Sequence, residues 1–231
     1  MIADNLARVH ARIATACARS GRPVGNVTLL AVSKTHGADA VRLAVAAGQT
    51  RFGENQVQEA VAKMDALADF GPALEWHLIG PLQSNKTRLA AERFDWVQSV
   101  DRPSIAERLS AQRPEGLPPL SVCLQVNTSG EASKSGFAPD AVLDAARAVA
   151  ALPRLRLRGL MAIPEPTSDV AEQRVAHRAL RELFDAVVAA GIPLDTLSAG
   201  MSDDLEAAVA EGSTLVRVGS AIFGARGAPA T

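Results

Sequence analysis

Residues 27–37 read VTLLAVSKTHG, an apolar run rich in β-branched residues that ends in a lysine and a short turn. Such a run is typical of a strand that is buried on both faces of a parallel sheet. A dinucleotide-binding fold carries a glycine-rich fingerprint directly after its first strand, whereas this chain continues as SKTHG. The segment therefore favours a parallel-sheet protein of another kind.

After this segment, short strand-like runs alternate with longer stretches of helical periodicity along the rest of the sequence. The predicted strands are residues 27–34, 50–53, 75–79, 96–100, 120–126, 157–163, 196–199 and 214–218. The predicted helices are residues 38–47, 55–67, 84–94, 103–112, 139–151, 170–190 and 203–210, with a short turn at 220–223 and an additional amphipathic helix at 4–20. Eight such units favour a (β/α)8 barrel over an open doubly wound sheet. We predict an α/β fold: one TIM-barrel domain over residues 1–231, with an extra N-terminal helix.

The composition limits the classes of partner. The chain has 24 basic and 25 acidic residues and a net charge of −1, so electrostatics give no case for nucleic acid or a membrane surface. It carries no long apolar segment and no apolar signal core, and a cytoplasmic location is expected. Cys17 and Cys123 lie far apart in sequence and are expected to be small buried hydrophobes rather than metal ligands or a disulfide.

Lys34 stands at the end of the first predicted strand, where the chemistry of these barrels is concentrated. Burial disfavours the ammonium form of a lysine, which lowers its pKa and makes the amine a nucleophile toward carbonyls. One interpretation of this position is therefore a buried, reactive Lys34. The alternative is that Lys34 only marks the point where the strand enters water.

The loops after the last two predicted strands resemble a phosphate site. Ser202 is a suitable N-cap for the following helix, Gly219 allows close backbone approach, and Ser220 adds a hydroxyl. The alternative is ordinary capping and turn chemistry. Asp203 and Asp204 favour that alternative, since they would repel a phosphate unless they point away.

Arg217 alternates with Val216 and Val218 in the last strand, so it is expected to point into the barrel. An interior arginine is costly unless it is paired, either with a ligand acceptor or with an acid such as Glu54. A lysine, a phosphate site and this arginine together suggest pyridoxal 5′-phosphate (PLP), although phosphorylated-sugar chemistry would use similar groups.

Five motifs in order resemble the YggS/PROSC family of pyridoxal phosphate homeostasis proteins, and the match spans nearly the whole chain. They are AVSKTHG at 31–37, RFGENQVQE at 51–59, WHLIGPLQSNK at 76–86, GLMAIP at 159–164 and GMSDDLEAAVAEGSTLVRVGSAIFGAR at 200–226. That family is similar in fold to the barrel domain of alanine racemase, a fold type III PLP protein.

The resemblance implies a role for each candidate residue. Lys34 would hold PLP as a Schiff base, and Asn55 would lie near the cofactor. The phosphate would contact Ser202, Gly219 and Ser220, and the ring nitrogen would contact Arg217. The resemblance implies neither a catalytic residue nor a metal ligand.

Two loops bear on this resemblance. His36-Gly37 stands where the family has a proline after its lysine-threonine pair, and the loop at 127–136 retains SKSG with modest departures elsewhere. Lys134 in that loop is a candidate for a second, weaker aldehyde contact. His77 and Trp76 are expected to be a hydrogen-bonded wall residue and a packing residue, respectively.

Two functional classes follow from the cofactor. A racemase like alanine racemase needs a tyrosine base from an additional domain, and this sequence contains no tyrosine, which leaves only a substitute such as His36. The ring-nitrogen arginine also argues against strong carbanion stabilisation. We predict a PLP-binding protein of vitamin B6 homeostasis without established turnover, expected to be a monomer that passes PLP to apo-enzymes. The alternatives are a PLP-dependent amino-acid racemase and, more remotely, a sugar-phosphate lyase without cofactor.

Overall fold

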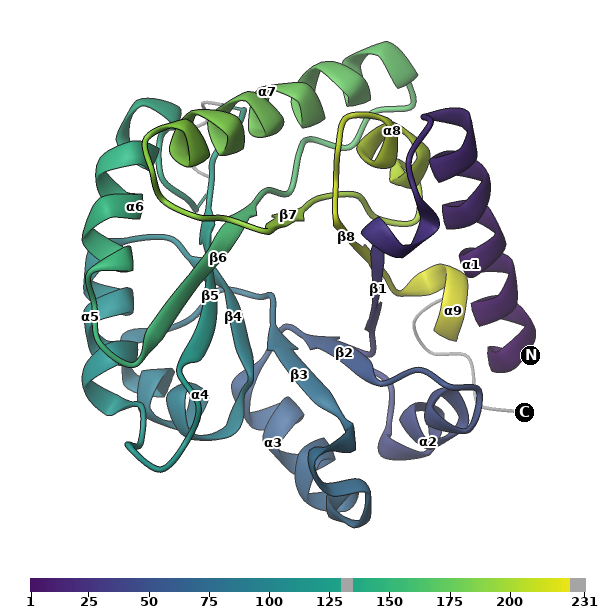
Figure 1. The fold of residues 1–231 in the computed structure, drawn as a ribbon. Helices are drawn as coiled ribbons and strands as arrows, with labels where there is room; N and C mark the ends of the chain where they lie inside the picture. Colours follow the sequence, from purple (N-terminus) through teal and green to yellow (C-terminus); the bar gives the residue numbers. More distant parts are fainter. Residues whose placement is uncertain (130–134, 225–231) are drawn as a thin grey trace.

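The structure is a computed structural model that describes residues 1–129 and 135–224. Eight parallel strands close into a barrel in the order of the sequence (Figure 1). They are β1 (Thr28–Val32), β2 (Arg51–Glu54), β3 (Glu75–Leu78), β4 (Trp96–Val100), β5 (Leu120–Gln125), β6 (Leu155–Met161), β7 (Thr196–Ser198) and β8 (Leu215–Val218). The prediction of a (β/α)8 barrel is confirmed.

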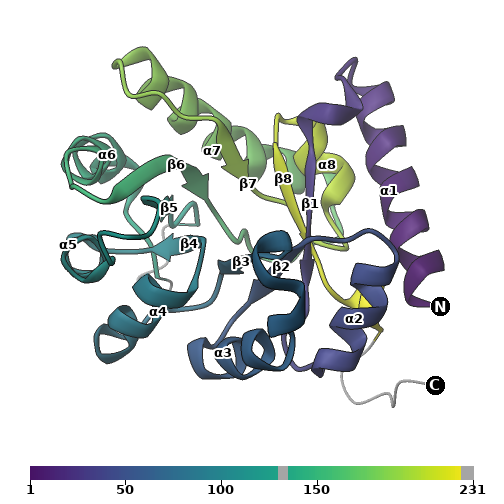
Figure 2. The same cartoon turned by 60° about the horizontal axis from the view of Figure 1, so that its bottom comes forward.

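Helices surround the barrel and connect its strands (Figures 1 and 2). They are α2 (Ala38–Ala46), α3 (Val57–Ala66), α4 (Thr87–Arg93), α5 (Pro103–Gln112), α6 (Val142–Ala150), α7 (Val170–Ala189), α8 (Leu205–Ala210) and the short α9 (Ser220–Phe223). The predicted extra helix is α1 (Ile2–Arg19), which lies outside the barrel against α8 and α9. It is amphipathic, and its buried face carries Leu6, Val9 and Ile13.

The strand predicted over residues 157–163 begins and ends two residues earlier in the structure. Arg154 adopts a φ of 61°, which turns the chain so that Leu155 already pairs with Leu120 of β5. At its other end, β6 stops at Met161, three residues before Pro164, which has no N–H to donate to a ladder. The predicted helices at 84–94 and 139–151 likewise begin as single 3₁₀ turns, Ser84–Lys86 and Pro139–Ala141.

The largest core lies between the strands and the helices, and it holds the outward-facing residues of the strands, such as Phe52, Trp76 and Val216. The barrel interior contains two smaller apolar clusters, Leu30, Val32, Ile79 and Leu215 in one and Trp96, Cys123 and Met161 in the other. Buried polar residues occur in the interior as well: His77, Gln98, Ser198 and Arg217. The wall therefore alternates as predicted, but its inner face is polar in part.

Both cysteines are buried free thiols, as the sequence predicts. Burial raises the pKa of the Cys123 thiol to about 12. Within residues 1–129 and 135–224, no cluster of three or more His, Cys, Asp and Glu side chains is arranged to hold a metal ion. In the same residues, no helix combines the length and the apolar character needed to cross a membrane.

Candidate functional site

Lys34 lies in the turn that follows β1, and its side chain is exposed rather than buried. The ladder continues only one residue past the strand, where the Ser33 N–H donates to the Gly53 carbonyl at 3.0 Å. The expectation of a buried Lys34, desolvated at the end of its strand, is therefore wrong, because the chain leaves the sheet before this residue. Lys34 makes no hydrogen bond or ion pair with any other residue that the structure describes, so none of these residues occupies its amine.

A buried lysine from α3 fixes the residue before Lys34. Lys63 Nζ donates to the carbonyl of Ser33 at 2.7 Å and to Glu54 Oε1 at 2.7 Å. The Ser33 hydroxyl donates to the same Glu54 oxygen at 2.6 Å. Burial raises the pKa of the Glu54 carboxyl, and the neighbouring Lys63 and Ser33 oppose that rise. These contacts hold the end of β1 against the start of the β2–α3 loop.

The residue after Lys34 is held by Glu59, a carboxylate of α3 that also pairs with Lys63. The Thr35 N–H donates to Glu59 Oε1 at 2.7 Å, and this carboxylate also pairs with Lys63 at 2.9 Å. Thr35 has a φ of 67°, in the left-handed region that β-branched residues rarely adopt. A strained conformation of this kind persists only when the surroundings enforce it, and such strain is concentrated at functional sites. The Lys34 turn is therefore rigidly positioned from both sides.

His36 connects this turn to the last loop of the barrel. Its ring stacks on Phe223 of α9, with centroids 5.2 Å apart and an interplanar angle of 29°. Burial lowers the pKa of His36, and the positive charge of Lys63 adds to that effect. The His36 ring thus packs the Lys34 turn against α9.

The two predicted phosphate loops come together. The hydroxyls of Ser220 at the start of α9 and of Ser202 after β7 lie 3.3 Å apart. A Cβ at Gly219 would lie 3.1 Å from the Val32 carbonyl oxygen, so this glycine permits close approach of β8 to β1. These three predicted residues form one polar patch beside the end of β1.

Ser202 is not the N-cap that the sequence predicts. Helix α8 begins later, and its N-cap residue is Asp204. The Asp204 carboxylate instead accepts the Met201 N–H at 2.6 Å and contacts His177 Nε2 of α7 at 2.9 Å. Burial acts to raise the pKa of Asp204, but these two contacts lower it overall. Its oxygens are thus engaged with protein groups, which answers part of the objection that it would repel a phosphate.

Helix α1 supports both serine loops, a role that sequence reasoning missed. Arg12 donates to the carbonyl of Ser202 at 2.9 Å and to both oxygens of Glu206 at 2.8 and 2.9 Å. Asn5 Nδ2 donates to the Ile222 carbonyl of α9 at 2.7 Å. The only available signal was the amphipathic pattern of the helix, which does not reveal these polar contacts.

Arg217 lies inside the barrel, as the alternation of β8 predicts, and only 3% of it is exposed. Its Nη1 donates to Ser198 Oγ at 2.6 Å, and its Nη2 donates to the Ala162 carbonyl at 2.8 Å. Burial lowers its pKa to about 10, although the charge of Asp204 opposes this. The alternative of an ion pair with Glu54 is wrong, because Glu54 pairs with Lys63.

Among residues 1–129 and 135–224, no carboxylate lies within ion-pair distance of Arg217. A buried cation with neutral partners alone is costly, so its position favours an acceptor from a bound molecule. A guanidinium has five N–H donors, and two contacts leave several of them for such a ligand.

Asn55 follows β2 and is half-buried. Because β1 and β2 are parallel neighbours with Val32 paired to Gly53, Asn55 and Lys34 each follow the carboxyl-terminal end of one of these strands. Gly80 crosses directly beside it, and a Cβ there would lie 2.2 Å from the Asn55 carbonyl oxygen. The register thus brings Asn55 and Lys34 to one end of the barrel. Lys134, the candidate second lysine, lies outside the described residues.

The fold and this site define a (β/α)8 barrel whose carboxyl-terminal mouth combines a free lysine, two adjacent serine hydroxyls and a buried arginine. The chain belongs to the family described as "Alanine racemase, N-terminal domain", whose model matches residues 5–227.

Full-length relatives of the chain carry a more specific name than the family model does. The pyridoxal phosphate homeostasis protein of Pseudomonas aeruginosa is 61% identical over all of this chain and 99% of its own length. Its counterpart in Escherichia coli K12 is 54% identical over 97% of both chains. The resemblance to pyridoxal phosphate homeostasis proteins is therefore confirmed.

Solved structures show the same architecture. PipY of Synechococcus elongatus, solved with PLP bound, superposes with a TM-score of 0.83 at 40% identity and covers 96% of this chain and 100% of its own. An alanine racemase of Clostridium difficile superposes with a TM-score of 0.71 at 14% identity, over 88% of this chain and 54% of its own. The second likeness shows the shared barrel fold alone.

Proposed function

We propose that this protein binds PLP at the carboxyl-terminal mouth of its barrel and serves PLP homeostasis. The observation that carries this proposal is the buried Arg217, a cation whose hydrogen-bond partners among residues 1–129 and 135–224 are neutral acceptors. It is supported by the PLP bound to PipY, whose chain is 40% identical to this one, and by the names of the homeostasis relatives.

The residues present fit this cofactor. The hydroxyls of Ser202 and Ser220, with the close backbone at Gly219, suit the phosphate. Arg217 would offer to the ring nitrogen those N–H donors that no described residue engages, and Lys34 would supply a primary amine that pairs with none of the described residues. When bound, PLP supplies an aldehyde that reacts with amines.

Each residue then has a binding role rather than a catalytic one. The contacts of Ser33 and Thr35 hold the Lys34 turn in place. Binding of PLP then costs little conformational entropy of the backbone at this turn. Arg217 would donate to the ring nitrogen and disfavour its protonation, which would weaken the cofactor as an electron sink. Asn55 lines the same end of the barrel.

We further propose that the protein binds PLP without catalysing the racemisation of amino acids. Racemisation needs a proton donor or acceptor on each side of the substrate carbon, and the chain contains no tyrosine for the second position. His36, the substitute base, stacks on Phe223 and has a pKa lowered first by burial. Consistent with a carrier, we propose a monomer of one domain that hands PLP to apo-enzymes.

The test is a titration of the purified protein with PLP, followed by absorbance. Wild type and Lys86→Ala, a matched lysine control, are expected to shift the PLP absorption band on binding, and Lys34→Ala is expected not to. Chiral analysis after incubation with single enantiomers of several amino acids is expected to show no conversion. A band shift that survives in Lys34→Ala, or turnover that is lost in it, would contradict the proposal.

A further inference from the structure

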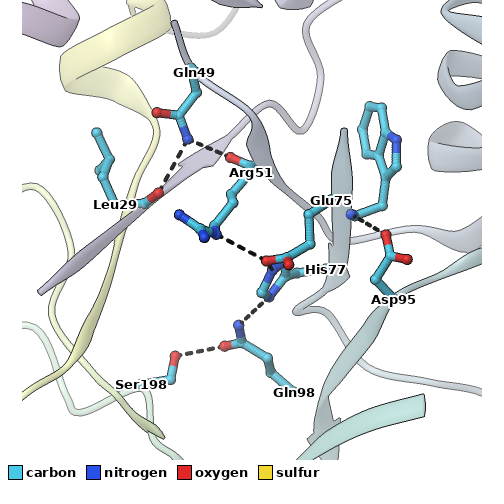
Figure 3. A network of polar contacts seen from close by, with 9 residues as sticks. Leu29, Gln49, Arg51, Glu75, His77, Asp95, Gln98 and Ser198 are labelled. Carbon is cyan, nitrogen blue, oxygen red and sulfur yellow. Dashed lines mark hydrogen bonds and ion pairs between the residues drawn. The ribbon is translucent and has the colours of Figure 1, made fainter. Parts of the chain in front are cut away.

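A continuous line of hydrogen bonds crosses the barrel interior from Glu75, near its amino-terminal end, to Ser198 (Figure 3), and a further hydrogen bond continues it to Arg217. Glu75 Oε1 lies 2.8 Å from His77 Nε2, His77 Nδ1 lies 2.8 Å from Gln98 Nε2, Gln98 Oε1 lies 2.6 Å from Ser198 Oγ, and Ser198 Oγ lies 2.6 Å from Arg217 Nη1. The four strands β3, β4, β7 and β8 supply these residues. We call this line the interior chain.

The two ends of the interior chain fix its direction. A guanidinium only donates, and an ionised carboxylate only accepts, so each group between them must accept on one side and donate on the other. Arg217 therefore donates to Ser198, and the serine hydroxyl donates to the Gln98 carbonyl oxygen. The Gln98 amide N–H donates to His77 Nδ1, and His77 Nε2–H donates to Glu75. One tautomer of a neutral imidazole satisfies all four contacts.

The surroundings of His77 agree with a neutral ring. Burial lowers the pKa of His77, and the neighbouring Glu75 opposes that effect. The charged groups that face it are Glu75, Arg51 of β2 and Asp95 before β4. Its ring also stacks on Trp96, with centroids 5.0 Å apart. A second proton on the imidazole would reverse the Gln98 contact and with it the contact to Ser198.

The interior chain ends at a second opening of the barrel. Glu75 there also accepts from Arg51 Nε at 3.2 Å and lines a cavity of about 600 Å³, opposite the mouth that holds Lys34. The interior chain thus connects buried Arg217 to the Glu75 carboxylate, which meets solvent, through the neutral side chains of Ser198, Gln98 and His77. Polarised hydrogen bonds in a low-dielectric interior strengthen one another, which provides Arg217 with a remote counter-charge.

We infer that Glu75, His77, Gln98 and Ser198 are positioning residues for Arg217: they fix the guanidinium where it meets the PLP ring nitrogen. This inference deepens the proposed function and rests on it. The alternative is that the interior chain only satisfies buried polar groups and stabilises the barrel. The two differ in what a broken chain does to the bound cofactor.

Two pairs of variants separate these accounts. His77→Leu removes the acceptor for Gln98, whereas His77→Asn replaces Nδ1 with an amide oxygen that still accepts. Gln98→Met interrupts the interior chain. Gln49→Met removes a comparable buried glutamine whose side chain, among the described residues, donates to the carbonyls of Leu29 and Arg51. If the inference holds, His77→Leu and Gln98→Met weaken PLP binding by about tenfold and shift the nitrogen resonance of ¹⁵N-labelled PLP. Gln49→Met should stay within about threefold of wild type, and His77→Asn, which keeps the contact to Gln98 but loses the one to Glu75, should bind PLP more tightly than His77→Leu and less tightly than wild type.

A measurement on the cofactor-free protein checks the direction of the interior chain. The ¹⁵N resonances of His77 should report a neutral ring with the proton on Nε2 at neutral pH. A proton on Nδ1, or on both nitrogens, would overturn the inference. Unchanged affinity and ring-nitrogen resonance in both His77→Leu and Gln98→Met, provided that they fold, would overturn it as well. If wild type itself binds no PLP, the proposed function fails instead. The ¹⁵N resonances of His77 still test the direction of the hydrogen bonds in the interior chain in that case.

Discussion

Lys63→Met is the substitution with the largest consequence for the Lys34 turn. Lys63 is 7% exposed and its partner Glu54 is 0% exposed, and the two atoms that pair lie 2.7 Å apart. Glu54 Oε2 already has no hydrogen-bond partner in the part of the protein that the structure describes. Loss of the ammonium would leave a buried carboxylate with the Ser33 hydroxyl as its one remaining donor.

The expected cost is large for a single side chain. Removal of one partner of a buried ion pair destabilises a protein by about 3–5 kcal/mol. With a urea m-value of about 2 kcal/mol/M, the unfolding midpoint should fall by about 1.5–2.5 M. The assay is urea unfolding at pH 7, followed by the fluorescence of Trp76 and Trp96.

Two controls define what would refute this reasoning. The double variant Lys63→Met/Glu54→Gln removes both charges and should recover most of the loss. Arg93→Met removes a partner of the exposed pair with Asp65 and should cost about 0–1 kcal/mol. If Lys63→Met costs less than about 1 kcal/mol, or if the double variant is no more stable than the single one, the buried pair does not hold the turn.

Four further outcomes follow from the structure. Gly159→Ala should destabilise the barrel by at least about 3 kcal/mol in urea unfolding, because a Cβ there would lie 1.6 Å from the Thr196 carbonyl oxygen; unfolding like that of wild type would contradict this contact. Asp204 has a lowered pKa, so its contribution to the free energy of unfolding is present at neutral pH and is lost as pH falls below about 4; the deficit of Asp204→Asn should therefore shrink in acid, and a constant deficit would refute this origin. Arg12→Ala should weaken PLP binding severalfold, as measured by absorbance titration, because the Ser202 loop loses its contact with α1; unchanged affinity would show that the loop holds itself. The Cys123 thiol, with its pKa raised to about 12, should resist thiol reagents at neutral pH until urea unfolds the protein, and rapid native labelling would contradict its burial.

The sequence predicts the barrel because two periodicities alternate along it without ambiguity. The flanking valines also predict that Arg217 faces the interior, since side chains in a strand alternate between its faces. The start of β6 was missed because the positive φ of Arg154 has no signal in a residue that is not glycine. A one-dimensional pattern shows which face a residue is on, but it does not show what meets that residue there.

The same limit explains what sequence reasoning missed at the site. Lys63 looks like an ordinary helix lysine until α3 brings it under Ser33, thirty residues earlier in the chain. Gln98 and Ser198 are separated by a hundred residues and meet only because the barrel closes. Ser202 carries the chemistry of an N-cap, but the Asp204 contacts with Met201 and His177 delay the start of α8. Tertiary contacts overrode local preference in each case.

The most direct measurement of the central claim is borohydride reduction of the PLP-loaded protein, followed by peptide mass mapping. The chain has four lysines, at positions 34, 63, 86 and 134, so the modified position can be assigned without ambiguity. The account predicts a pyridoxyl group on Lys34 and none in Lys34→Ala. An unmodified Lys34 in the loaded wild-type protein, or a modification confined to another lysine, would contradict it.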